Sequence, residues 1–214
     1  MTQPPTIAGV LLAGGLSRRM GGGDKSLRVL GGATILARVI ARARPQVAAL
    51  VLNANGDPAR FREFGLPVVS DSIPDFAGPL AGVLAGLDWT AANVAAATHV
   101  ASFATDTPFL PTDLVARLTA AVRDGKHDLA CAASDGRSHP VFGLWSLDLR
   151  EDLRAALKSG VRKVDQWTAR HRLAVVEFPA QPYDPFFNTN TPEDLNEGER
   201  VGRAADATRR AAPS

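Results

Sequence analysis

The stretch between positions 14 and 25 has residue types and spacing that suit the binding of a polyanion. Glycines stand at 14–15 and 21–23, arginines at 18 and 19, and a lysine at 25. Glycine lets backbone N–H groups approach phosphate oxygens, and the cations can neutralise charge that moves toward a leaving group. The spacing is not that of a P-loop, because Asp24 precedes Lys25, nor that of a dinucleotide fingerprint, because Ser26 takes the third glycine position counted from Gly21. We therefore predict a long phosphate-binding loop, with a mobile loop of solvated arginines as the alternative.

Polar side chains also stand where apolar runs end. Asn53, Asp71 and Asp106 each close or follow such a run. Facing a polyphosphate, Asp106 could bind Mg²⁺, which takes one or two carboxylates together with substrate oxygens. The alternative for all three is a turn residue that bonds its own backbone. Position alone leaves both interpretations open.

The elements that must position these residues alternate between short apolar runs and longer segments of helical periodicity, which indicates an α/β fold. We predict a three-layer, Rossmann-like, mostly parallel sheet with helices on both faces and a small antiparallel piece in the C-terminal half. The predicted strands are 7–12, 47–53, 66–69, 99–104, 128–133, 140–145 and 173–178, and the predicted helices are 33–44, 58–64, 79–89, 111–123, 147–158, 164–172 and 194–201.

In open parallel sheets, ligands bind beyond the carboxyl ends of the strands. The residues 12–15, Asn53, Asp71 and Asp106 are therefore expected to converge on one crevice. We expect a flexible N-terminus over 1–6, a single domain over 7–200 and a flexible tail over 201–214.

Composition limits the possible functions. The chain is 45% hydrophobic with a formal charge of +2, and its cations are interleaved with acids, so a nucleic-acid partner is not expected. No uncharged apolar run approaches the ~20 residues needed to span a bilayer, so a membrane is not expected either. The one cysteine, Cys131, lies in an apolar run and is interpreted as a buried hydrophobe. The four histidines lack zinc-like spacing, and no G-x-S-x-G surrounds a serine. We expect a cytoplasmic protein.

Five co-linear stretches resemble the nucleotidyltransferase superfamily that transfers nucleoside monophosphates, and in detail the molybdenum cofactor guanylyltransferase (MobA) family. They are LLAGGLSRRMGGGDKSL from Leu11, VLNANGD from Val51, DSIPDFAGPLAGVLAGL from Asp71, FATDTPFLP from Phe103 and FFNTNTPEDL from Phe186. The resemblance covers about 7–196, and the set is more specific than any single glycine cluster.

The resemblance implies a GTP site with Mg²⁺. The matching positions are Leu12, Ala13 and Gly14 around the nucleotide, Lys25 on its phosphates, Asn53 and Asp71 near the guanosine, Asp106 on magnesium, and Asn188 or Asn190 on the metal or acceptor side. We expect Gly15 to hold the triphosphate with Gly14 and Lys25, and Arg19 to offset charge on the leaving group together with Lys25. Arg162-Lys163 resembles a basic pair near the pterin, and His139-Pro140 resembles a segment that faces the acceptor. The asparagines could instead serve as turn and capping residues before Pro192.

The implied reaction transfers GMP from GTP to the terminal phosphate of molybdopterin and releases pyrophosphate. An ionised acceptor phosphate needs no strong general base, so catalysis would depend on positioning and charge neutralisation. Close relatives that use CTP typically read Leu-Ala-Ala-Gly where this chain reads Leu-Ala-Gly-Gly, and the extra glycine favours a purine. A CTP-dependent cytidylyltransferase, a sugar-1-phosphate nucleotidylyltransferase and a non-catalytic nucleotide-binding module are the alternatives. The family also implies transient contacts with molybdenum cofactor biosynthesis proteins and with apo-molybdoenzymes or their chaperones.

Overall fold

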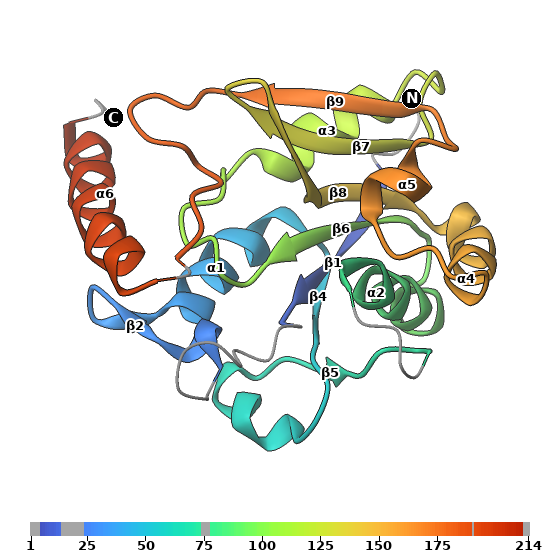
Figure 1. Cartoon of the computed structure of the whole chain (residues 1–214), viewed down its shortest axis with the longest axis horizontal. Coiled ribbons are helices and arrows are strands. Elements are labelled where there is room, and N and C mark those ends of the chain that lie inside the picture. Colours follow the sequence, from blue (N-terminus) through green and yellow to red (C-terminus); the bar gives the residue numbers. More distant parts are fainter. Residues whose placement is uncertain (1–4, 14–23, 74–77, 190, 212–214) are drawn as a thin grey trace.

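One sheet of seven strands organises the molecule, and its spatial order is β5-β4-β1-β6-β8-β7-β9 (Figure 1). The computed structural model of the chain describes residues 5–13, 24–73, 78–189 and 191–211. The strands of this sheet are β1 (Thr6–Leu12), β4 (Ala49–Asn53), β5 (Val68–Val69), β6 (Ala97–Ala104), β7 (Leu129–Ser134), β8 (Arg137–Ser146) and β9 (Leu173–Phe178), and β2 (Val29–Leu30) and β3 (Ala33–Thr34) form a separate hairpin.

The helices lie between these strands in the chain. They are η1 (Lys25–Leu27), α1 (Ile35–Ala43), η2 (Arg44–Gln46), η3 (Pro58–Phe64), α2 (Pro79–Asn93), α3 (Leu114–Val122), η4 (Leu147–Leu149), α4 (Arg150–Lys158), α5 (Val164–Thr168) and α6 (Pro192–Ala211), where η marks a 3-10 helix. None of them, within the described residues, is long and apolar enough to cross a membrane.

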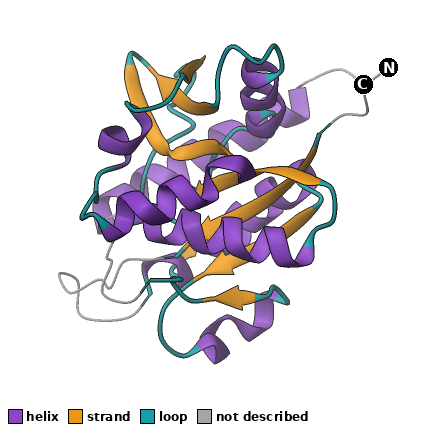
Figure 2. Ribbon diagram, turned by 90° about the vertical axis from the view of Figure 1, so that its right-hand side faces the viewer, coloured by secondary structure: helices purple, strands orange, loops and turns teal. Residues whose placement is uncertain are grey.

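The pairing of the strands divides the sheet into a parallel and a mixed part. β5, β4, β1 and β6 are parallel neighbours, whereas β8 is antiparallel to both β6 and β7, and β9 is parallel to β7. The mostly parallel α/β sheet with an antiparallel piece in the C-terminal half is thereby confirmed. Figure 2 shows helices on both sides of the strands.

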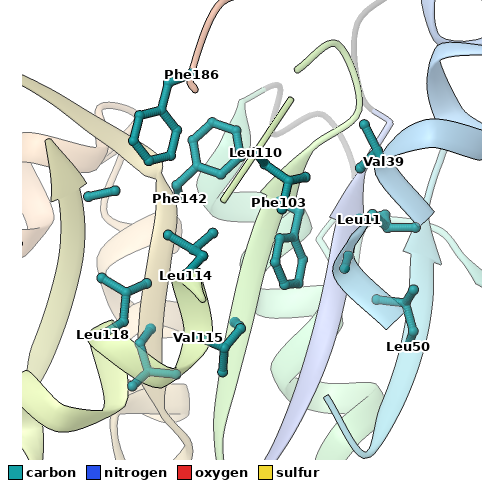
Figure 3. Packing of buried hydrophobic residues seen from close by; sticks show 14 of the residues in the cluster. Leu11, Val39, Leu50, Phe103, Leu110, Leu114, Val115, Leu118, Phe142 and Phe186 are labelled. Carbon is teal, nitrogen blue, oxygen red and sulfur yellow. The ribbon is translucent and has the colours of Figure 1, made fainter. Parts of the chain in front are cut away.

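Two apolar clusters fill the two sides of the sheet, because neighbouring residues of a strand point to opposite faces. Leu11 of β1 packs with α1 and α3, and Figure 3 shows it near Val39 and Leu50, with Phe103 beside them. Val10 points to the other face, where it packs in a cluster with α2, α4 and α5. Each face of the sheet is therefore covered, which is what a parallel sheet requires.

Helix α2 approaches the sheet closely because it carries glycines where it crosses the strands. A Cβ added at Gly86 would lie 2.7 Å from Cβ of Val10, and one added at Gly82 would lie 2.3 Å from Oδ1 of Asn53. Real Cβ atoms do not come this near to other heavy atoms. The two glycines thus allow α2 to lie directly on β1 and β4.

The buried Ser102 hydroxyl replaces backbone hydrogen bonds at the point where β6 and β8 separate. Paired residues of β6 and β8 end at Ala101 and Leu144. Beyond them, the Ser102 hydroxyl donates to the carbonyl of Val141 (2.6 Å) and accepts from the indole N–H of Trp145 (2.7 Å) and, at 3.3 Å, from the backbone N–H of Gly143. The ends of the two strands can therefore separate without leaving these groups unpaired.

Some helix ends differ from the prediction. Residues 33–34 form β3, and Thr34 caps α1 by accepting from the N–H of Ala37 at 3.1 Å. Helix α5 ends at Thr168, and α6 runs to Ala211, well past the predicted end at about Val201. Apolar periodicity was the wrong guide to α6, since its last turns are rich in alanine and arginine, which favour helix without an apolar face. The flexibility of 201–214 in solution stays a prediction.

Candidate active site at the carboxyl edge of the parallel strands

The carboxyl ends of β1, β4 and β6 are tied together at one edge of the sheet. The N–H of Ala13 donates to the carbonyl of Asn53 (2.9 Å), and the hydroxyl of Thr105 donates to the carbonyl of Leu12 (3.1 Å). The turn after β1 is thus bonded to the ends of both neighbouring strands. Leu12 and Ala13 therefore lie between the ends of β4 and β6 at this edge of the sheet.

Asp71 is held next to this centre by two asparagine amides. Asn53 Nδ2 donates to Asp71 Oδ1 (3.0 Å), and Asn55 Nδ2 donates to Asp71 Oδ2 (2.7 Å). In return, the backbone N–H of Asp71 donates to Asn55 Oδ1 (3.0 Å). Both carboxylate oxygens are therefore fixed in place. The sequence analysis overlooked Asn55, although it stands two residues after Asn53 at the same strand end.

The Asn53 amide helps to hold the Asp71 carboxylate in place. Its side chain is 3% exposed, and its Nδ2 also lies 3.3 Å from the carbonyl of Val69. Its Oδ1 faces the backbone of Gly82, where no Cβ would fit. The structure brings Asn53 and Asp71 together, as predicted, but gives them different surroundings, because Asn53 is enclosed while Asp71 is partly exposed.

Asp106 follows β6 and is a partly buried carboxyl group. Burial raises its pKa above the ordinary range of an aspartate, although its own backbone N–H, the Thr107 hydroxyl and the charge of Lys25 act in the opposite direction. A carboxylate that has lost part of its hydration favours a cation as neighbour.

The surroundings of Asp106 fit a divalent cation whose other ligands come from a substrate. Within the described residues no group of three or more His, Cys, Asp or Glu side chains could hold a metal by itself. Mg²⁺ commonly binds proteins through one or two carboxylates and takes its remaining ligands from phosphates and water. A single partly buried carboxylate at the carboxyl edge of the parallel strands matches that pattern.

The segment 184–189 comes from the far end of the chain and reaches Asp106. The N–H and the hydroxyl of Thr189 both donate to the carbonyl of Asp106, at 2.9 and 3.0 Å. The hydroxyl of Thr107 donates to Asn188 Oδ1 (2.7 Å) and also lies 3.3 Å from Asp106 Oδ1. Asn188 therefore lies one side chain away from the carboxylate.

Several predicted residues fall outside the described part of the chain. These are Gly14, Gly15, Arg19 and Asn190. Just after the first gap, Asp24 forms an ion pair with Arg60 of η3 (3.1 Å), which fixes the chain where it leaves the glycine-rich stretch and enters η1.

The structure also shows where two further predicted segments lie, Arg162-Lys163 and His139-Pro140. Arg162 and Lys163 line an open pocket with Gly160, Asp165 and Gln166. Arg162 Nη1 donates to the carbonyls of Leu157 (3.1 Å) and Val161 (3.0 Å), which holds the guanidinium near its own backbone. The carbonyl of Arg162 would lie 3.6 Å from a Cβ at Gly78, so this pocket adjoins the start of α2.

His139 packs against the segment 184–189, on the face of the sheet opposite to the pocket of Arg162 and Lys163. Its ring stacks on Phe186 at a centroid distance of 4.5 Å. Burial lowers its pKa, and Arg137 adds to this, while Asp184 and Glu177 act in the opposite direction. His139 is therefore mainly neutral near pH 7.

Comparison with known proteins agrees with this geometry. Residues 9–174 match the model of the family described as the MobA-like NTP transferase domain. The chain is 60% identical to a molybdenum cofactor guanylyltransferase of Nitrobacter hamburgensis over 92% of this chain and 95% of that protein. It is also 60% identical to one of Bradyrhizobium sp. over 96% and 99% of the two chains.

Solved structures share the fold at lower identity. Molybdopterin-guanine dinucleotide biosynthesis protein A from Archaeoglobus fulgidus matches with a TM-score of 0.71 and 22% identity over 92% of this chain and 99% of that chain. A Mycobacterium tuberculosis protein in complex with manganese matches with a TM-score of 0.66 and 18% identity over 91% and 98%. With a family match over residues 9–174 and relatives at 60% identity, the chain belongs to the molybdenum cofactor guanylyltransferases within the MobA-like NTP transferase family.

Proposed function

We propose that this protein transfers GMP from GTP to the terminal phosphate of molybdopterin, releasing pyrophosphate and forming the guanine dinucleotide form of the molybdenum cofactor. It is a nucleotidyltransferase, as its family membership shows. The observation that carries the proposed chemistry is the desolvated carboxylate of Asp106, under the influence of Lys25, at the edge where four strands end.

The reaction is an in-line displacement at the α-phosphorus. An oxygen of the acceptor phosphate attacks, a new P–O bond forms, and the bond from the α-phosphorus to the bridging oxygen of the β-phosphate breaks. The leaving pyrophosphate keeps the electron pair. Because the acceptor is already an anion near neutral pH, the protein must align and neutralise rather than remove a proton.

The side chains divide this work between them. Lys25 offsets the charge that grows on pyrophosphate, together with Arg19, and such stabilisation of developing charge is a large term in catalysis. Asp106 holds Mg²⁺, which supplies charge neutralisation at the phosphates when it is bound. Asn188, which accepts from the Thr107 hydroxyl beside Asp106, is assigned to the metal or acceptor side. Manganese in a structure with the same fold supports a divalent cation here without distinguishing Mg²⁺ from Mn²⁺.

The guanosine is assigned to the side of Asp71 and the turn after β1. A carboxylate with both oxygens held in place can accept further hydrogen bonds from the N–H groups of guanine, since each oxygen has two lone pairs. The glycine at position 14, where CTP-using relatives typically carry alanine, favours a purine. The main alternative function is that of a CTP-dependent cytidylyltransferase.

The direct test is pyrophosphate release from GTP with Mg²⁺ and molybdopterin. We expect release by the wild-type chain, none by Asp106→Ala and much less by Lys25→Ala, with both variants folded by circular dichroism. Tight GTP binding without pyrophosphate in the wild type would leave a nucleotide-binding module instead of an enzyme. Undiminished release by either variant would remove that side chain from the mechanism.

Base choice is tested separately by thermal shift with GTP, CTP and ATP, because a ligand that binds the folded state raises its apparent stability. The largest shift is expected with GTP. A larger shift with CTP would reassign the base.

A further inference from the structure

A cluster of three polar side chains lies at the start of the segment 184–189, beside the carboxyl end of β7. Ser134 ends β7 and is 2% exposed. Its Oγ lies 2.9 Å from Asp184 Oδ1 and 2.7 Å from His139 Nε2. These residues come from β7, β8 and the loop after β9, so the cluster joins three separate parts of the chain.

The directions of these hydrogen bonds follow from the groups involved. An ionised carboxylate only accepts, so the single hydroxyl proton of Ser134 goes to Asp184. The oxygen of Ser134 must then accept from His139, which fixes the neutral imidazole with its proton on Nε2. The order His139 to Ser134 to Asp184 differs from that of a hydrolytic triad, in which the histidine stands between the other two and the serine is exposed to substrate.

Asp184 in turn fixes the start of the segment. Its Oδ1 also accepts from the N–H of Phe186 (2.9 Å), and its carbonyl accepts from the N–H of Phe187 (3.2 Å). Phe186 is 3% exposed and packs against Phe142 and Phe178 as well as against the His139 ring. The start of the segment is therefore held by hydrogen bonds and by an aromatic anchor.

The end of the segment is held at the site itself. Thr189 donates twice to the Asp106 carbonyl, and Asn188 accepts from Thr107. The segment is thus stretched between two fixed points, the Ser134 cluster and the residue proposed to hold the metal. A change at the first point must alter the geometry at the second unless the segment relaxes in between.

We propose that Ser134, His139 and Asp184 are positioning residues for the metal side of the site, and that they act through the segment 184–189 on Asn188 and Asp106. This inference rests on the proposed function in so far as Asp106 holds a divalent cation. None of the three touches the reacting atoms. Supporting side chains of this kind typically change metal affinity or activity about 10- to 100-fold when they are removed.

The test measures binding of Mn²⁺ in the presence of GTP but without molybdopterin, so that no turnover occurs. Free Mn²⁺ is followed by electron paramagnetic resonance, and amide hydrogen exchange is followed in the peptide that contains 184–189. We expect Ser134→Ala and Asp184→Ala to need about tenfold more Mn²⁺, with faster exchange in that peptide and an unchanged thermal shift by GTP alone. Asp184→Asn keeps an acceptor for Phe186 N–H and should restore part of the affinity.

The matched control lies elsewhere in the fold. Asp152 Oδ1 accepts from Trp167 Nε1 (2.8 Å) and His171 Nε2 (3.1 Å), so Asp152→Ala breaks a similar cluster of aspartate, histidine and aromatic residue. Normal Mn²⁺ binding is expected for this control. An equal loss in Asp152→Ala would make the effect one of general stability and would overturn the proposal.

A double mutant tests the route of the effect. In an Asn188→Ala background, Ser134→Ala should cost little further Mn²⁺ affinity, because linked residues are not additive. Full additivity, or wild-type binding and exchange in Ser134→Ala, would refute the role of the cluster. A wild-type chain that binds Mn²⁺ and GTP but releases no pyrophosphate would instead refute the proposed function, and the exchange data would still report on the segment.

Discussion

Replacing Gly82 by alanine should damage the fold and the nucleotide edge together. The added Cβ would lie 2.3 Å from Oδ1 of Asn53 and 2.7 Å from Cδ2 of Leu12. Either α2 moves away from the sheet or these two side chains move. Because Asn53 also donates to Asp71, a shift of its amide would break that hydrogen bond.

The expected cost follows from three contributions. Overpacking of a tight core costs about 1–3 kcal/mol, and loss of the hydrogen bond to Asp71 about 0.5–1.5 kcal/mol. The better helix propensity of alanine returns about 1 kcal/mol. We therefore expect Gly82→Ala to lose about 0.5–3.5 kcal/mol of unfolding free energy, with a Tm lower by about 2–4 °C for each kcal/mol in a chain of this size.

Two other glycines of the chain provide controls. The three atoms nearest to a Cβ at Gly86 all belong to Val10, so Gly86→Ala should lose similar stability but keep GTP affinity. A Cβ at Gly202 in α6 would stand 3.8 Å from Phe109, an ordinary contact, so Gly202→Ala should be neutral or slightly stabilising. Urea unfolding and GTP titration measure both quantities. Equal stability of the Gly82 and Gly202 variants, or equal loss of GTP affinity in the Gly82 and Gly86 variants, would refute this reasoning.

Two more predictions concern buried polar groups. Burial raises the pKa of Asp106, so the folded state binds its proton more tightly than the unfolded state, and stability is lost as pH rises from the ordinary aspartate pKa through the raised one. In metal-free buffer Asp106→Asn should therefore be more stable than the wild type at neutral pH, and this difference in stability should shrink at acid pH. Thermal melts measure it, and a difference that does not change with pH would contradict the raised pKa of Asp106. Ser102→Ala would leave three groups on β8 without their hydrogen-bond partner. Since an unsatisfied buried group costs about 1–3 kcal/mol, urea unfolding should show a loss of unfolding free energy in at least that range. A loss below about 0.5 kcal/mol would mean that β6 and β8 move together and satisfy these groups.

The parallel half of the sheet could be predicted because its signals are local. Each strand is a short apolar run that ends in a polar residue, and the rule that such ends converge was enough to bring Leu12, Asn53, Asp71 and Asp106 to one edge. Helix α6 could not be bounded in the same way. Its last turns depend on helix propensity, which leaves no apolar stripe in the sequence.

The cluster of Ser134, His139 and Asp184 could not be predicted, for a different reason. Ser134 and Asp184 are 50 positions apart, and each is an ordinary turn residue in the sequence. Only the parallel pairing of β7 with β9 brings them together. Gly82 was likewise read as part of a motif, whereas its close approach to Asn53 depends on how α2 crosses the sheet.

The bond from Thr189 to the Asp106 carbonyl also sets an order of events during synthesis. The two residues are 83 positions apart. At a translation rate of about 5–20 residues per second, Thr189 is added about 4–17 s after Asp106. The parallel half of the sheet can form in that interval, while the carbonyl of Asp106 still bonds to water. The edge formed by β1, β4 and β6 can thus form first, and the contact between Asp106 and the segment 184–189 is completed only after Thr189 has been added.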